Sequence, residues 1–254
     1  MKKAFIITSV IDPDNSYPLT YAKVRSIFTA EERERQTIMT INSLDHISDP
    51  DTVIFMLEIS EDSNLYKEKF WYQKNLVFIS VKEQFPEIYY EVKSHPNKSR
   101  CEALLLESFM RKYKKELSEF DYFFKISGRY FLDSSFDISL FNEYNKDKIF
   151  FKKALSFEWK DQFWVYNVVD RRDVQRDNCL RQYCTTIFGW GKEHYDHFLD
   201  MFTVTANLLK LHRYQHFDVE TFLYYFTRKY EKDVIETDWI TYGWTGVEGR
   251  FLRY

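Results

Sequence analysis

One stretch of the chain carries cationic and polar residues toward the end of an otherwise apolar strand. The segment FDYFFKISGRYFLD starts at Phe120 and ends at Asp133, and it contains Lys125, Ser127 and Arg129. In open α/β sheets, ligands bind beyond the carboxyl ends of the strands. A guanidinium fork matches phosphate oxygens, and an ammonium group supplies a point charge. The segment therefore predicts a phosphate-binding site.

Gly128 lies between the polar residues, and a glycine lets the backbone approach a ligand closely. A purely structural interpretation is also consistent with the segment. In that case Arg129 forms an ion pair with Asp121 or Asp133, and Gly128 only turns the chain. The residue types alone leave both interpretations open.

Two acids near the C-terminal end of the chain are candidates for a general base. Asp218 stands directly before an apolar helical stripe, in the position of an N-cap. Glu220 falls in the first turn of that helix, off the stripe, where the helix dipole favours the ionised carboxylate. A carboxylate within hydrogen-bond reach can take the proton of an attacking hydroxyl. An acid in a first turn is also ordinary helix chemistry, so both interpretations stand.

Other polar residues fall at the ends of predicted elements. Thr8 and Ser9 end the first predicted strand, and Lys98 and Arg100 lie at the start of a predicted helix. From these places the four residues could face a ligand. Polar residues at strand ends and solvated charges at helix starts are also common without any ligand, and the sequence does not distinguish the two cases.

Two further patterns have simpler explanations. Ser99 and Glu102 have capping-box spacing, which accounts for Glu102 without a ligand. His212, His216 and Glu220 have i,i+4 spacing, as a metal-binding helix face would. A helix start between His216 and Glu220 breaks that face, so the sequence predicts no metal site there.

The first half of the chain alternates apolar strands with amphipathic helices. Apolar runs predict strands at Lys3–Ile11, Val53–Ile59, Leu76–Val81 and in the segment from Phe120. A capping box at Thr29–Glu32 begins a helix to about Leu44, and Ser99 begins another. This alternation predicts an α/β fold with a central, mostly parallel, twisted sheet flanked by helices.

The second half has a different pattern. The predicted strands are Lys148–Leu155, Gln162–Val169 and Val234–Tyr242, and the predicted helices are Tyr195–Leu211 and Asp218–Tyr230. Phe217 and Phe222 have the spacing of a hydrophobic staple around the second helix start. Because no repeat, low-complexity segment or linker interrupts the chain, we expect one domain over residues 1–254, with halves at 1–135 and 136–254.

Composition limits the classes of function. The chain has 254 residues, 44% apolar, with a net charge of -3, which excludes a general electrostatic field for nucleic acid. Three cysteines without paired spacing indicate a reducing compartment. The N-terminal apolar run stops at Asp12, which is typical of a strand rather than a signal peptide. No segment has the roughly 18 apolar residues of a membrane span, so we expect a cytoplasmic location.

The residues Lys125-Ile126-Ser127-Gly128-Arg129-Tyr130 resemble a segment of bacterial glycosyltransferases that build lipopolysaccharide and capsule. Those enzymes have a GT-A-like fold, and this subgroup carries K-x-S/T-G-R-Y in place of the Asp-x-Asp motif. The segment YCTTIFGW (183–190) is similar to their acceptor-side segment. The segment HFDVETFLYYF (216–226), followed by a strand and GVEG, is similar to their C-terminal arrangement.

The resemblance implies a glycosyltransferase that moves a sugar from a nucleotide-activated donor to a hydroxyl of a glycan or lipid-linked acceptor. It implies donor binding in residues 1–135, acceptor binding in 136–254, and peripheral contact with the inner membrane surface. It favours Glu220 as the base, with Asp218 second. The implied donor-binding residues are Thr8, Ser9, Lys98, Arg100, Lys125, Ser127, Gly128, Arg129, Tyr130 and Arg250.

The absence of Asp-x-Asp implies that a divalent cation, Mg²⁺ or Mn²⁺, is not essential. Arg129, Lys125 and a tail arginine, Arg250 or Arg253, would meet the charge of the diphosphate. Fixed cations can stabilise a leaving group as a metal does. A displaced metal site at Asp121 or Asp133 remains an alternative.

Two other functions are compatible with the residues. A nucleotidyltransferase would also bind a nucleotide, but that chemistry usually needs paired acids for metal ions. A non-catalytic sugar- or nucleotide-binding protein would use the many Tyr and Trp residues for stacking. Binding of a nucleoside diphosphate without hydrolysis or transfer would distinguish this last class.

Overall fold

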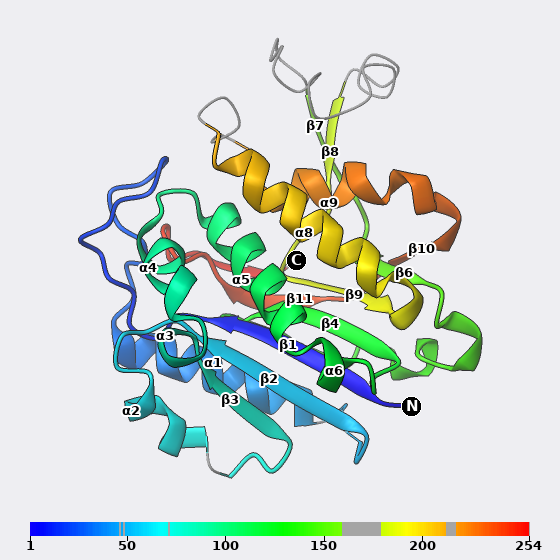
Figure 1. Ribbon diagram of the computed structural model, residues 1–254, viewed down its shortest axis with the longest axis horizontal. Coiled ribbons are helices and arrows are strands. Elements are labelled where there is room, and N and C mark those ends of the chain that lie inside the picture. The colour runs from blue at the N-terminus through cyan, green and yellow to red at the C-terminus, as the bar shows by residue number, and fades with distance from the viewer. Residues whose placement is uncertain (46, 48, 71, 159–178, 212–216, 254) are drawn as a thin grey trace.

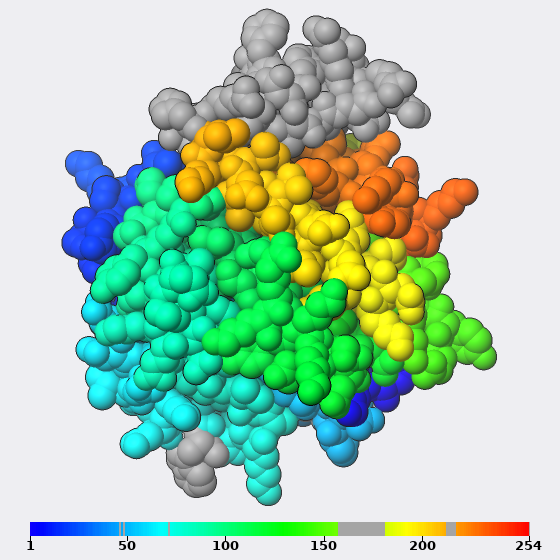
Figure 2. Space-filling model, in the orientation of Figure 1, coloured from blue at the N-terminus to red at the C-terminus, as the bar shows by residue number. Residues whose placement is uncertain are grey.

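The computed structural model of the protein describes residues 1–254 except 46, 48, 71, 159–178, 212–216 and 254. A seven-stranded sheet runs through the middle of the molecule (Figure 1). Three helices, α4 (Pro86–Ser94), α5 (Lys98–Lys112) and α8 (Tyr195–Leu209), lie on one face of the sheet, and α1 (Ala30–Asp45) lies on the other. In the same orientation, the side chains of the first group form the surface that covers the sheet (Figure 2).

The large sheet consists of β1 (Lys3–Ser9), β2 (Thr52–Glu58), β3 (Leu76–Ser80), β4 (Tyr122–Ser127), β6 (Ile149–Lys152), β9 (Ile187–Gly191) and β10 (Val234–Thr237). One small sheet consists of β5 (Tyr130–Leu132), β11 (Thr241–Trp244) and β12 (Phe251–Arg253), and another of β7 (Leu155–Glu158) and β8 (Cys179–Gln182). The remaining α-helices of the described residues are α2 (Asn64–Lys67), α3 (Val81–Gln84), α6 (Lys114–Leu117) and α9 (Val219–Thr227). No helix in the described part of the chain is long and apolar enough to cross a membrane.

The strand order of the large sheet is β10-β6-β9-β4-β1-β2-β3. β1 pairs in parallel with β2 and β4, β2 with β3, and β10 with β6. β9 is antiparallel to both of its neighbours, β4 and β6. The predicted α/β fold with a mostly parallel sheet is therefore confirmed. Because β1 and β4 are parallel neighbours, their carboxyl ends meet at one edge of the sheet.

The central strands are apolar on both sides because both faces of the sheet are covered. In β1, Ala4 and Ile6 belong to the core under α5 and α8, while Phe5 and Ile7 belong to the core under α1. This period of two is the alternation of a strand, and it explains why the run in the sequence is continuously apolar.

Two predicted strands are divided in the structure. The run predicted as Val234–Tyr242 forms β10 and β11, which belong to different sheets. Trp239, between them, is buried among core aromatics, so the apolar pattern continues although the strand does not. The run predicted as Lys148–Leu155 likewise becomes β6 and the start of β7. The predicted strand Gln162–Val169 lies outside the described residues.

The helix starts test the capping patterns. Thr29 and Glu32 bond reciprocally, with backbone-to-side-chain distances of 2.8 and 3.2 Å, as a capping box does. Asp218 caps α9, because its Oδ1 accepts from the Thr221 amide at 2.9 Å. The capping box predicted at Ser99 is wrong. Asn97 caps α5 through the Arg100 amide at 2.9 Å.

Candidate functional site

A cavity of about 750 Å³ opens at the carboxyl ends of β1 and β4. The start of α5, the residues between β8 and β9, the start of α9 and the turn between β11 and β12 complete its walls. Eight of the predicted site residues line it: Thr8, Ser9, Lys98, Ser127, Arg129, Tyr130, Asp218 and Glu220. The sheet therefore brings together residues that are more than 200 positions apart in sequence.

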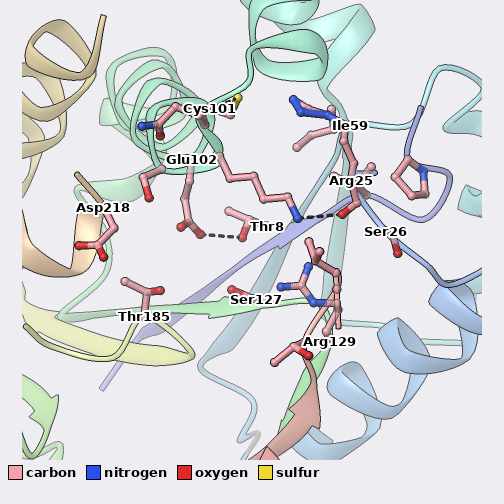
Figure 3. A pocket seen from close by; sticks show the side chains of 18 of the residues that line it. Thr8, Arg25, Ser26, Ile59, Cys101, Glu102, Ser127, Arg129, Thr185 and Asp218 are labelled. Atoms are coloured by element: carbon pink, nitrogen blue, oxygen red, sulfur yellow. Dashed lines mark hydrogen bonds between the residues drawn. The ribbon is translucent and has the colours of Figure 1, made fainter. Parts of the chain in front are cut away.

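Arg129 extends from the end of the central strand into this cavity (Figure 3). Its Nε donates to the Trp244 carbonyl at 3.1 Å, which fixes the guanidinium plane. The Nη1 and Nη2 atoms make no hydrogen bond, and the side chain makes no ion pair, with any described residue. The acids proposed as its structural partners are engaged elsewhere: Asp121 pairs with Lys146, and Asp133 accepts from the Ser135 amide.

Three more cations face the cavity, and they also donate hydrogen bonds to backbone carbonyls. Lys98 Nζ donates to the Arg25 carbonyl at 2.8 Å. The Arg25 guanidinium donates to the carbonyls of Lys93 and His95, and the Arg33 guanidinium to that of Val10. Within the described part of the chain, none of these three side chains forms an ion pair with a carboxylate. Among the described residues, four cationic side chains therefore converge with no carboxylate at ion-pair distance.

Burial and the proximity of these cations lower the pKa values of two of them, Lys98 and Arg33. Burial and the charges of Arg129, Arg33 and Arg25 lower the pKa of Lys98 to about 7. Burial, together with Arg129, lowers the pKa of Arg33 to about 9. An anion bound among the four cations would relieve both perturbations. Arg25 and Arg33 were not among the residues predicted for this site. One feature of the sequence could have indicated Arg33, because this arginine lies on the buried face of α1. Arg25 lies in a loop, where no periodic pattern marks it.

The opposite wall of the cavity is acidic. Glu102 accepts from Thr8 Oγ1 at 3.2 Å and forms an ion pair with Lys125. Glu220 Oε1 accepts from Thr185 Oγ1 at 2.5 Å. Figure 3 shows Glu102, Asp218 and Thr185 on one side of the cavity and Arg25 and Arg129 on the other. The site is therefore polarised, with an anion-binding side and an acidic side.

Glu220 differs from its expectation in one respect. The helix dipole was expected to favour its ionised form, but burial and the charge of Asp218 raise its pKa to about 8. Glu102 raises the pKa further, while the hydrogen bond from Thr185 lowers it. Burial and like charges outweigh the dipole because the dipole effect is limited to about 2 kcal/mol even in favourable sites.

Four predicted donor-binding residues do not line the cavity. Lys125 is fully buried beside it, and Arg100 is buried against Glu91 and α8. Gly128 is buried, and a Cβ there would lie 3.2 Å from the side chain of Ser9, so its small size serves chain packing. Arg250 is exposed and lies 3.5 Å from Glu248.

The described residues offer no group of three metal-ligating side chains. Asp121 precedes β4, so the six residues of that strand, roughly 20 Å of chain, separate it from the cavity. Asp133 follows β5 and is held by its own loop. Neither Asp121 nor Asp133 lines the cavity. His212 and His216 lie outside the described residues.

No family model and no curated protein matches the chain. A solved structure does: mouse xyloside xylosyltransferase 1 in its apo form has a TM-score of 0.50 at 11% identity. The match covers 94% of this chain and 86% of that chain. At such low identity the likeness concerns the fold alone. The chain has the α/β fold of a GT-A-like glycosyltransferase.

Proposed function

We propose that the protein is a glycosyltransferase that uses a nucleotide-activated sugar donor. One observation carries this proposal: four cations, Arg25, Arg33, Lys98 and Arg129, converge at the ligand edge of the sheet and form no ion pair with any carboxylate of the described residues. A pyrophosphate is the anion that such a cluster suits, because arginine forks bind phosphate oxygens bidentately. The glycosyltransferase-like fold supports the same conclusion.

The polarised cavity matches the two demands of glycosyl transfer. The acceptor hydroxyl forms a bond to the anomeric carbon as the bond from that carbon to the diphosphate oxygen breaks. The leaving nucleoside diphosphate keeps the bonding electron pair, and the cation cluster would stabilise its charge. The hydroxyl proton must pass to a base, and Glu220 on the acidic wall is our candidate, with Asp218 second.

Asp218 is the weaker candidate because its Oδ1 already accepts two bonds from Thr221, one from the amide and one from the hydroxyl. Glu220 accepts a single side-chain hydrogen bond, from Thr185. It lies in the cavity wall and can reach the ionised state near neutral pH. An inverting reaction would use such a base directly.

We further propose that the reaction needs no divalent cation, because the four cations take the place of a metal at the diphosphate. In this proposal the acceptor is a hydroxyl of a glycan or a lipid-linked glycan in bacterial surface polysaccharide synthesis. The enzyme would act in the cytoplasm, at the inner surface of the membrane where such acceptors are presented. The S-G-R-Y segment supports this assignment.

The first experiment is a thermal-shift screen of nucleoside diphosphates and their sugars, since a ligand that binds only the folded state raises the melting temperature. Arg129→Ala should reduce the shift, because it weakens binding of the diphosphate. Arg111→Ala, an exposed arginine of α5 paired with Glu107, is the matched control and should keep it. Absence of any shift in the wild type would overturn the proposal.

A second measurement separates the alternatives. Release of nucleoside diphosphate from the donor, in the presence of candidate acceptors, identifies a transferase. Binding without release would identify a non-catalytic binding protein. Release of pyrophosphate from a nucleoside triphosphate, with an absolute cation requirement, would identify a nucleotidyltransferase.

A further inference from the structure

Lys125 is the cation of the segment from Phe120 to Asp133, here called the central segment, that does not line the cavity. It lies in β4, between the apolar residues Phe124 and Ile126, and its side chain has no exposed surface. Its Nζ pairs with Glu102, donates to Ser127 Oγ at 2.8 Å and donates to the Thr185 carbonyl at 3.0 Å. An ammonium has three hydrogens, so these partners use its whole donor capacity.

The sheet itself does not require this charge. Its neighbours in β4, Phe124 and Ile126, are apolar members of the core. Replacing a buried ion pair by apolar groups is often neutral or stabilising, because the pair must be desolvated. A lysine at this position is therefore better explained by what it holds than by the stability of the strand.

The three partners belong to different elements of the site. Glu102 lies on α5, Ser127 ends β4 beside Arg129, and Thr185 lies between β8 and β9. The same Thr185 whose carbonyl accepts from Lys125 uses its hydroxyl to hold Glu220 Oε1 at 2.5 Å. Lys125 is thus connected through Thr185 to the Glu220 carboxylate.

We propose that Lys125 is a positioning residue of the acidic wall: it fixes Thr185 and Glu102 so that the Thr185 hydroxyl holds the Glu220 carboxylate toward the acceptor, and it does not contact the donor diphosphate. This inference rests on the proposed function. It assigns the two cations of the central segment to different tasks, with Arg129 at the diphosphate and Lys125 at the base.

The test compares Lys125→Met, which keeps length without charge, with Arg129→Ala. We measure the dissociation constant of the nucleoside diphosphate by calorimetry, and kcat and KM by donor turnover. Lys125→Met should leave the dissociation constant within about threefold of the wild type and lower kcat about 10- to 100-fold, as loss of orientation does. Arg129→Ala should weaken diphosphate binding instead.

Thr185→Val supplies a second route that leaves the buried pair intact. It removes the hydroxyl that lowers the pKa of Glu220, so the rise of kcat with pH should move to higher pH. Because both residues act through Glu220, the losses of kcat in Lys125→Met and Thr185→Val should not add in the double variant. A structural role of Lys125 alone would give additive losses.

The outcomes separate this inference from the function on which it rests. If the wild type binds no nucleoside diphosphate, the proposed function falls. If the wild type binds and turns over donor, but Lys125→Met weakens diphosphate binding as Arg129→Ala does, Lys125 contacts the donor and the inference is wrong. An unchanged kcat and pH profile in Thr185→Val would also overturn it, even if Lys125→Met does not fold.

Discussion

Replacing Glu220 by Gln tests the assignment of the base most directly. The amide keeps the size of the side chain and can still accept the hydrogen bond from Thr185 Oγ1. It cannot take a proton from the acceptor hydroxyl. A positioned base contributes about 10²–10⁴-fold to rate, so we expect kcat to fall by about that factor while donor affinity stays nearly unchanged.

The pH dependence follows from the environment of Glu220. Only the ionised carboxylate is a base, and burial beside Asp218 places its pKa at about 8. With this pKa, about 1% of the protein carries the active base at pH 6 and about half at pH 8. We therefore expect kcat to rise about tenfold per pH unit below pH 7 and to level off above pH 8. The Gln variant should lose this rise.

As pH rises, the free energy of unfolding should decrease, whereas kcat should increase. Between the ordinary value of 4.5 and the raised pKa of about 8, the folded protein binds more protons at Glu220 than the unfolded chain does. The free energy of unfolding therefore falls as pH increases through this window. Glu220→Gln removes this loss of stability. The difference in melting temperature between the variant and the wild type should therefore increase, in favour of the variant, from pH 5 to pH 9.

The assay measures kcat from pH 5.5 to 9.5 for the wild type, Glu220→Gln and a matched control. The control is Glu31→Gln, another acid in a first helical turn, which is exposed and paired with Arg35. It should leave kcat unchanged. A Glu220→Gln enzyme with near-normal kcat would refute the assignment, and Asp218 would be tested next. A product with retained anomeric configuration, seen by NMR of its anomeric proton, would remove the need for this base.

Three further predictions concern the cation cluster. Arg129→Ala should weaken nucleoside-diphosphate binding about 10- to 100-fold, as loss of a charge-assisted hydrogen bond does. Arg129→Lys should restore binding only in part, because the guanidinium fork is lost. Calorimetry measures both affinities, and wild-type affinity in the Ala variant would contradict the proposed diphosphate site. Because burial and Arg129, Arg33 and Arg25 lower the pKa of Lys98 to about 7, binding of the diphosphate at pH 8 should take up protons. Calorimetry in buffers of different ionisation enthalpy measures this uptake, which should disappear in Lys98→Met. Turnover should survive EDTA, and complete loss that Mg²⁺ or Mn²⁺ restores would show that a cation is required.

Patterns of apolar and capping residues predicted most of the fold. Period-two and continuous apolar runs locate β1, β2, β3 and β4, and capping residues locate the starts of α1 and α9. The same patterns could not separate β10 from β11, because Trp239 between them is an apolar residue buried in the core. An apolar residue in a core turn and one in a strand look alike in sequence, since burial rather than backbone conformation selects both.

The place of Arg129 at the end of a central strand was also predicted from the sequence. Only the tertiary structure decided which charges meet. Arg25 and Arg33 join Lys98 and Arg129 because a loop and the buried face of α1 cross the sheet edge there.

The ion pair between Lys125 and Glu102 likewise depends on the tertiary structure, because the packing of α5 against the sheet brings the two residues together. Local propensities act over a few residues and can be read along the chain. The balance of charges and desolvation depends on side chains far apart in sequence, so it is fixed only when the strands and helices pack together.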